Sequence, residues 1–264
     1  MTSLRFAANL SMLYPEFPFL ERFAHAAHDG FRGVEFLFPY SYPPELLANH
    51  LGQNGLEQVL FNAPPGDWDA GDRGIACLPG REAEFRHSFL EALRYARALS
   101  CPRIHVMSGI YQGHTERDRA VEVYRNNLTW ALGESDGEIN LLIEPINTRD
   151  MLGYLISLQE DAHQLVREVG SSRLKVQMDL YHCQIMEGDV TSRLRRYLKP
   201  GGRVGHLQIA GVPGRNEPSE SELSFEYLFP VIEQLGYSGW IGCEYRPLKG
   251  TSEGLHWLRR YPRP

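Results

Sequence analysis

Short runs of β-type residues alternate with longer amphipathic stretches along the whole chain. Eight of these runs are predicted as strands: Leu4–Asn9, Gly33–Phe36, Leu56–Asn62, Arg103–Ser108, Asn140–Glu144, Leu174–Asp179, Val204–Ile209 and Trp240–Glu244. The stretches between and after them are predicted as helices: Phe19–Asp29, Pro44–Asn54, Arg81–Leu99, Glu116–Leu132, Leu158–Val169, Val190–Leu198, Phe225–Leu235 and Ser252–Arg259. Eight units of roughly 30 residues each predict an α/β fold, a (β/α)8 barrel with residues 1–264 as one domain.

The spacing of apolar residues supports the helices. In Arg81–Leu99, for example, Phe85, Phe89 and Leu93 recur at four-residue steps, which places them on one helix face. An open, doubly wound sheet is the main alternative architecture, and it usually carries a glycine-rich phosphate turn after the first strand. Residues 9–12 read Asn-Leu-Ser-Met, without glycine. The barrel is therefore favoured.

Composition excludes several classes of protein. The chain has 27 Lys and Arg against 33 Asp and Glu, a formal net charge of -6, which offers no general attraction for nucleic acid or an anionic membrane. No apolar run reaches the roughly 18 residues of a membrane span, and the N-terminus does not read as a signal peptide. Four separated cysteines without a CxxC pair are typical of reduced thiols, so a cytoplasmic location is predicted.

Oxygen-bearing side chains stand at or near the carboxyl ends of the last four predicted strands. They are Glu144, Asp179, Gln208 and Glu244. Active sites of (β/α)8 barrels lie at this end of the strands, and a ring of hard oxygen donors suits Mg²⁺ or Mn²⁺. Taken singly, each carboxylate could instead cap a helix or pair with an arginine. Together they predict a divalent-metal site at the barrel mouth.

Strand alternation places a second layer of residues beneath these four. Gln177 and His206 would point into the barrel one layer down, as buried polar groups that need partners. The metal-site carboxylates above them are the predicted partners, so both residues are predicted to support the metal ligands. For His206 the alternative is a hydrogen-bonded core histidine with no connection to the metal.

Two further residues are candidates for binding substrate. His182 follows the sixth strand on a predicted loop and could hydrogen-bond a substrate oxygen, although a helix cap or a surface position fits equally well. Arg215 lies in a turn-rich loop after the seventh strand. It could clamp a substrate carboxylate through two parallel hydrogen bonds, or it could be an ordinary exposed arginine.

The connection after the third strand, residues 63–79, is long for a barrel loop. It carries Trp68 and Arg73, which are predicted either to close over the site as a lid or to form a contact between subunits of a homo-oligomer. The sequence does not decide between these two roles.

The sequence resembles the hydroxypyruvate isomerase family of xylose-isomerase-like barrels over nearly its whole length. The segments that carry the resemblance are RFAANLSMLY, GFRGVEFLFPY, GDWDAGDRGIACLPGREAEFR, LLIEPIN, QMDLYHCQIMEGD, GHLQIA and GWIGCEYRP. The resemblance implies interconversion of hydroxypyruvate and tartronate semialdehyde, or the analogous isomerisation of a 2-oxo-tetronate. It also implies a divalent metal on Glu144, Asp179, Gln208 and Glu244, with Glu144 and Glu244 as the acid–base pair and no organic cofactor.

One segment departs from the pattern of that family. After the seventh strand, Gly211 stands where the family has an acidic residue, and Ser219–Glu222 replaces a glycine turn, which leaves the substrate preference open. Related ketose epimerases carry His where this chain has Gln208, which disfavours that branch. The alternatives are a sugar epimerase, an inosose-type dehydratase, an apurinic-site endonuclease, which would need more metal-binding histidines and a basic face, and a non-catalytic barrel that binds a sugar acid.

Overall fold

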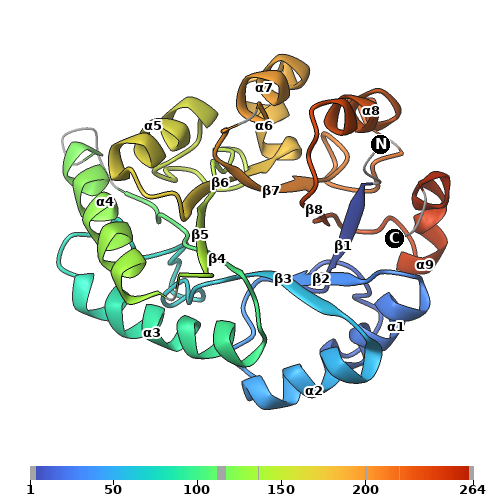
Figure 1. Cartoon of the computed structure of the whole chain (residues 1–264), viewed down its shortest axis with the longest axis horizontal. Helices are drawn as coiled ribbons and strands as arrows, with labels where there is room; N and C mark the ends of the chain where they lie inside the picture. Colours follow the sequence, from blue (N-terminus) through green and yellow to red (C-terminus); the bar gives the residue numbers. More distant parts are fainter. Residues whose placement is uncertain (1–3, 112–116, 136, 200, 220, 262–264) are drawn as a thin grey trace.

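The computed structural model describes residues 4–111, 117–135, 137–199, 201–219 and 221–261. Within these ranges, eight parallel strands pair in chain order and the last closes onto the first (Figure 1). They are β1 (Arg5–Asn9), β2 (Gly33–Phe36), β3 (Glu57–Asn62), β4 (Arg103–His105), β5 (Asn140–Ile143), β6 (Leu174–Asp179), β7 (Val204–Ile209) and β8 (Trp240–Cys243). The predicted (β/α)8 barrel is confirmed.

Helices surround the barrel on its outer side (Figure 1). They are α1 (Arg22–His28), α2 (Pro44–Asn54), α3 (Glu82–Ala98), α4 (Arg117–Glu134), α5 (Gln159–Val169), α6 (Leu180–Met186), α7 (Val190–Tyr197), α8 (Phe225–Gln234) and α9 (Thr251–Gly254), with 3-10 turns η1 (Phe19–Glu21) and η3 (Leu255–Arg260). In α3 the predicted apolar face is buried, with Phe89 and Leu93 almost fully covered. None of the helices in the described ranges has the length and hydropathy that a bilayer span requires.

The helix α6 is the main difference from the predicted elements. The sequence analysis predicted a loop here, but the helix begins directly after β6. It has seven residues, too few for a repeating apolar pattern to be recognised. Its amino end is capped by Asp179, whose Oδ1 accepts a hydrogen bond of 2.8 Å from the Tyr181 backbone N–H.

Smaller differences concern the ends of elements. β4 and β5 end at His105 and Ile143, so Ser108 and Glu144 lie just beyond the paired strands, and Glu244 likewise follows β8. The predicted last helix is divided into α9 and η3, and the first into η1 and α1. Two predicted positions, the helix start at 116 and residue 220 within the divergent segment, lie outside the described residues.

The interior of the barrel is apolar in one part and polar in another. A small apolar cluster, separate from the large core between strands and helices, is formed by Ala7, Val59, Leu60, Leu142 and Trp240. Polar side chains of β6 and β7 fill another part of the interior, with Gln177, His206 and Gln208 all buried. The barrel is therefore a packed core that becomes polar where it approaches the site.

Candidate active site

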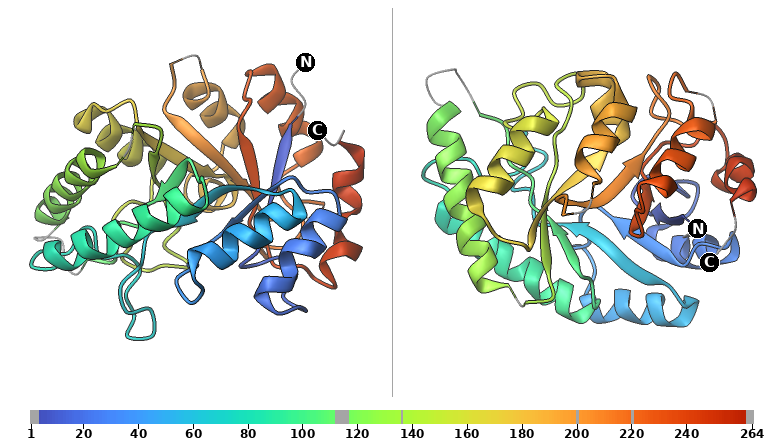
Figure 2. Two further views of the ribbon diagram at one scale, coloured as in Figure 1. Left: turned by 60° about the horizontal axis from the view of Figure 1, so that its bottom comes forward. Right: turned by 45° about the horizontal axis from the view of Figure 1, so that its top comes forward.

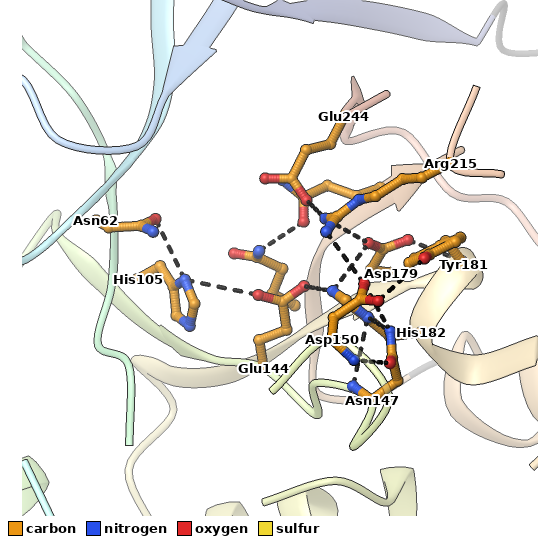
Figure 3. Close-up of polar contacts among 12 residues, drawn as sticks. Asn62, His105, Glu144, Asn147, Asp150, Asp179, Tyr181, His182, Arg215 and Glu244 are labelled. Carbon is orange, nitrogen blue, oxygen red and sulfur yellow. Dashed lines mark hydrogen bonds and ion pairs between the residues drawn. The ribbon is translucent and has the colours of Figure 1, made fainter. Parts of the chain in front are cut away.

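Four buried side chains meet at the mouth of the barrel. Glu144, Asp179, His182 and Glu244 each offer a ligand atom, and these atoms all lie within 4.8 Å of one another (Figure 3). Glu144 and Glu244 follow β5 and β8, Asp179 ends β6, and His182 stands in the first turn of α6. Three of the four predicted metal-binding residues are therefore brought together, as strands of a closed barrel require.

Two oxygens of this group have no hydrogen-bond donor within the described chain. Glu144 Oε1 and Asp179 Oδ2 are both buried and accept no hydrogen bond, although Arg215 Nη2 lies 3.8 Å from Asp179 Oδ2. A buried carboxylate oxygen without a hydrogen bond is costly, because it has lost its hydrogen bonds to water and gained none in return. A divalent cation would compensate both oxygens at once, and carboxylate donors suit Mg²⁺ or Mn²⁺. The residues present thus fit a bound divalent metal.

The crowding of acidic groups also affects their protonation. Burial, followed by the neighbouring Glu244 and Asp179 carboxylates, raises the pKa of Glu144 well above its ordinary value. Burial raises the pKa of Glu244 to about 8 and that of Asp179 to about 6, although Arg215 lowers both. Without a cation, Glu144 and Glu244 therefore favour the protonated form near neutral pH, as expected for carboxylates that share a buried site.

Gln208, the fourth predicted metal ligand, lies inside the barrel beside the acidic group. Its Oε1 accepts a hydrogen bond of 2.6 Å from Gln177 Nε2, and its own Nε2 donates to Glu35 Oε1 at 2.8 Å. Gln177 also hydrogen-bonds Glu144, in line with its predicted supporting position. The predicted ligand role of Gln208 stays a prediction, since its neutral amide is held by protein partners on both sides.

The predicted partner of His206 was wrong. The residue does not contact a carboxylate of the acidic group but pairs through Nε2 with Glu35 Oε2, at 2.7 Å. Glu35 belongs to β2, across the barrel, and the sequence analysis missed it. The four-residue strand β2 is buried throughout, so no alternation indicated which way Glu35 points. Only the closure of the barrel brings the two residues together.

The tautomer of His182 follows from its contacts with Asn147. The Asp150 backbone N–H donates to Asn147 Oδ1 at 2.8 Å, which turns the Asn147 NH₂ group toward His182. That group lies 2.6 Å from His182 Nδ1, and the Asn147 backbone N–H points at the same nitrogen from 3.4 Å. Nδ1 therefore accepts, and Nε2 carries the proton.

This tautomer limits what His182 can do. Its Nε2–H lies 3.5 Å from Asp179 Oδ2 and 3.9 Å from Glu144 Oε1 (Figure 3). A protonated nitrogen has no free lone pair for a metal, so the arrangement favours a hydrogen bond to a carboxylate or a substrate oxygen over metal ligation. Burial, then Arg215, lowers the pKa of His182 well below its ordinary value, which keeps the ring neutral. Asn147 was another residue that the sequence analysis missed.

Arg215 faces the acidic group and is largely buried. Its Nη2 lies 2.5 Å from Glu244 Oε2 and 3.8 Å from Asp179 Oδ2, while Nη1 lies 3.6 Å from Asp150 Oδ2 (Figure 3). Its guanidinium also lies over the Tyr181 ring, 4.9 Å from the centroid. The backbone of Arg215 is in the left-handed region, with φ of 56°, so the loop holds it in an unusual conformation. The exposed-arginine alternative is therefore excluded.

A cavity of about 380 Å³ opens above these residues. Trp68 and Arg73 both line it, and the Arg73 guanidinium stacks on the Trp68 ring at 3.9 Å. Their loop extends away from the barrel, as the teal segment in Figure 2 shows. Asn62 and His105 line another wall of the cavity, where His105 Nδ1 lies 3.7 Å from Glu144 Oε2 (Figure 3). The placement agrees with the lid position, although the roles of Trp68 and Arg73 stay predictions.

Comparison with known proteins bears on this site directly. The profile of the xylose isomerase-like TIM barrel family matches residues 23–261. The chain belongs to this family. The resemblance that the sequence analysis described is thereby confirmed.

Curated relatives extend over almost the entire chain. A 2-oxo-tetronate isomerase of Cupriavidus necator is 55% identical over 258 residues, 97% of this chain and 98% of the relative. A hydroxypyruvate isomerase of Escherichia coli is 47% identical over 98% of this chain and 99% of the relative. The predicted enzyme class, an isomerase, is confirmed by these relatives.

Solved structures show the same architecture. A Brucella melitensis protein described as an AP endonuclease of family 2 has a TM-score of 0.94 and 49% identity, with 99% of each chain covered. A 3-keto-D-glucoside 4-epimerase from E. coli has a TM-score of 0.72 at 20% identity, covering 98% of this chain and 99% of the epimerase. The likeness to the epimerase is one of fold alone.

Proposed function

We propose that this protein is a metal-dependent isomerase that interconverts hydroxypyruvate and tartronate semialdehyde. The observation that carries the proposal is the convergence of Glu144, Asp179 and Glu244, with two of their oxygens buried and without a hydrogen bond. The isomerases that are 55% and 47% identical to this chain supply the reaction class. A 2-oxo-tetronate, with one more carbon, is the alternative substrate.

The proposed ligands of a divalent Mg²⁺ or Mn²⁺ are Glu144, Asp179, Gln208 and Glu244. A bound cation would stabilise the negative charge that develops on the oxygens of an enediolate. Three carboxylates and one divalent cation leave a single negative charge, which the Arg215 guanidinium offsets, while Asp150 beside Arg215 adds another negative charge. Arg73 and Arg246 line the same cavity and supply further positive charge for an anionic substrate.

Glu144 and Glu244 are proposed to move the protons. They directly follow β5 and β8 and lie on separate sides of the group that Figure 3 shows. In the forward reaction one glutamate removes a proton from the hydroxymethyl carbon, and the other returns a proton to the former carbonyl carbon. The former carbonyl oxygen gains a proton and the hydroxymethyl oxygen loses one, so the overall change is an isomerisation. General acid–base catalysis of this kind typically contributes about 10² to 10⁴ in rate.

His182 and Arg215 are proposed to hold the substrate. The Nε2–H of His182 would donate to a substrate oxygen beside the metal. Arg215 is ion-paired to Glu244 and has its Nε buried without a partner, so one donor remains for a substrate carboxylate. Trp68 and Arg73 are proposed to cover the cavity once substrate has bound.

An NMR time course with hydroxypyruvate in D₂O tests the proposal, with added Mg²⁺ or Mn²⁺ and with chelator in a parallel sample. We expect formation of tartronate semialdehyde with deuterium at the carbon that receives the proton, and loss of activity on chelation. A 2-oxo-tetronate offered in competition decides between the two substrates by the ratio of kcat/KM. Failure to convert either acid, with the metal bound, would contradict the proposal.

The name of the Brucella relative suggests a second candidate, cleavage of DNA at abasic sites. A net charge of -6 opposes it, because DNA binding depends on cationic groups that neutralise phosphates. A duplex with one abasic site, incubated with the protein and Mg²⁺ or Mn²⁺, tests this activity. We expect no strand cleavage under conditions in which the isomerase reaction is complete.

A further inference from the structure

Glu35 is a buried carboxylate that none of the proposed steps uses. It is 1% exposed and lies within the barrel rather than in the acidic group at the mouth. Three side chains from two other strands surround it: Asn9 of β1 lies at 3.0 Å, and His206 and Gln208 of β7 lie at 2.7 and 2.8 Å. Every one of these contacts presents an N–H to a Glu35 oxygen.

The backbone of β8 makes room for this carboxylate. A Cβ atom on Gly242 would lie 2.4 Å from both carboxylate oxygens of Glu35, closer than real contacts allow. The glycine in β8 is therefore required by the glutamate that crosses the barrel from β2. The position of Glu35 therefore depends on Gly242, because a larger residue at 242 would displace Glu35 from its partners.

The chemistry of a carboxylate decides how its amide neighbours are oriented. A carboxylate accepts hydrogen bonds, so an amide that faces it must present its NH₂ group. Glu35 thus turns the nitrogen of Gln208 toward itself and the oxygen of Gln208 away, toward Gln177. The oxygen is the atom that a metal ligand needs.

Asn9 extends the same arrangement to the acidic group. Its NH₂ group donates to Glu35 Oε1 at 3.0 Å and to Glu244 Oε1 at 3.2 Å. Its own oxygen accepts from the Ser11 backbone N–H at 3.1 Å, which fixes the amide in this orientation. Glu35 is therefore connected to a proposed metal ligand on each side, Gln208 directly and Glu244 through Asn9.

We propose that Glu35 is a positioning residue, which orients the Gln208 and Asn9 amides so that the metal site is formed before metal binds. The inference rests on the metal ligands of the proposed function. It extends that proposal, because metal affinity would then depend on Glu35, a buried residue that lies outside the acidic group. Partners that orient metal ligands typically contribute about 10- to 100-fold in metal affinity or activity.

The test is Mn²⁺ binding to the whole chain, without substrate, measured by the EPR signal of free Mn²⁺. Glu35→Gln keeps the shape of the side chain but replaces one acceptor by a donor. We expect the Kd for Mn²⁺ to rise about tenfold or more. Gly242→Ala leaves Glu35 chemically unchanged but displaces it, and it should raise the Kd in the same direction.

A matched control exists in the same molecule. Glu217 is 5% exposed, accepts hydrogen bonds from the Leu248 backbone N–H, and lies where a Cβ on Gly254 would come within 2.4 Å of it. Glu217→Gln and Gly254→Ala therefore reproduce the burial and the steric change away from the acidic group. Both should leave the Kd for Mn²⁺ within about twofold of wild type.

The outcomes separate the two proposals. If Glu35→Gln and Gly242→Ala lower the melting temperature yet leave the Kd for Mn²⁺ within twofold, Glu35 is only a structural residue and the inference is overturned. Wild-type protein that does not bind Mn²⁺ also overturns it. Wild-type protein that binds Mn²⁺ but isomerises neither acid contradicts the proposed function, and the comparison of Kd values still decides the role of Glu35.

Discussion

The two halves of the barrel mouth differ sharply in charge. The half built on β5–β8 carries the ionisable groups Glu144, Asp179, Arg215 and Glu244. Apart from Arg73, which stacks on Trp68, the groups that line the same cavity from the half built on β2–β4 are neutral, namely Phe38, Asn62, Trp68 and His105. Burial, followed by His206, lowers the pKa of His105 to about 3, so this histidine is neutral at physiological pH.

The difference indicates a division of tasks within one cavity. In the proposed reaction, metal binding and proton transfer use buried carboxylates, and these are collected on one side, where burial and then mutual repulsion raise their pKa values. The neutral side adds no charge apart from that of Arg73. His105 Nδ1 lies 3.2 Å from Asn62 Oδ1, and His105 Nε2 is buried without a hydrogen-bond partner in the described chain. The comparison predicts that substitutions on the charged half will affect turnover far more than those on the neutral half.

The largest expected effect is on the two glutamates. Glu144→Gln and Glu244→Gln should each reduce kcat at least about 10²-fold, because each removes a group that transfers a proton. Circular dichroism should show an intact fold in both variants. Asn62→Ala, on the neutral half, is the matched comparison and should cost less than tenfold. Near-normal turnover in either glutamine variant would remove that glutamate from the acid–base pair.

Asn147→Asp tests the tautomer of His182 on the charged half. The aspartate offers an acceptor where Asn147 offers a donor, so the proton should move to His182 Nδ1 and free Nε2 to compete for the metal. We expect kcat to fall about tenfold. Nitrogen-15 NMR of the imidazole gives the tautomer of each protein. The same tautomer in wild type and variant would refute the assignment.

Arg215→Ala should raise the KM for the acid substrate about tenfold, as expected for the loss of a charged hydrogen bond. Arg246 lines the same cavity but is exposed, and it provides the comparison. Arg246→Ala should change KM by less than threefold, because exposed ion pairs contribute little. If instead Arg246→Ala raises KM and Arg215→Ala does not, the carboxylate anchor is at the rim of the cavity rather than beside the metal.

The two halves should also differ in their effect on stability with pH. The raised pKa of Glu244, about 8, means that the folded protein holds a proton that the unfolded chain has already lost, so stability falls as pH rises toward 8. The lowered pKa of His105 affects stability in the opposite direction. Below about pH 6.5 the unfolded chain binds a proton at this histidine that the folded protein does not bind, so stability falls as pH falls below that value. Between pH 6.5 and 8 the carboxylates alone should therefore decide the slope.

Urea unfolding of chelator-treated protein measures this slope. We expect the free energy of unfolding to decrease by on the order of 1 kcal/mol between pH 6.5 and 8. Saturating Mn²⁺ should abolish the decrease, because the bound cation favours the ionised carboxylates. A free energy that stays constant or rises with pH in the metal-free protein would contradict the charge distribution described for this half.

Local patterns in the sequence determined a large part of this protein. The alternation of strand and helix predicted the barrel, because apolar periodicity reflects which face of each element is buried. The ends of β5, β6 and β8 then predicted Glu144, Asp179 and Glu244 as neighbours, because the strands of a closed barrel end at one rim. These inferences need only short segments and the known geometry of the fold.

Tertiary structure alone decided the contacts between distant segments. Glu35 pairs with His206 because Gly242 of a third strand leaves space for it, and no periodicity connects those positions. The tautomer of His182 depends on Asn147, 35 residues earlier. Arg215 itself has a left-handed backbone conformation, and its guanidinium contacts Glu244. Such contacts depend on how the closed barrel packs, whereas a sequence pattern reports only which face of each element is buried.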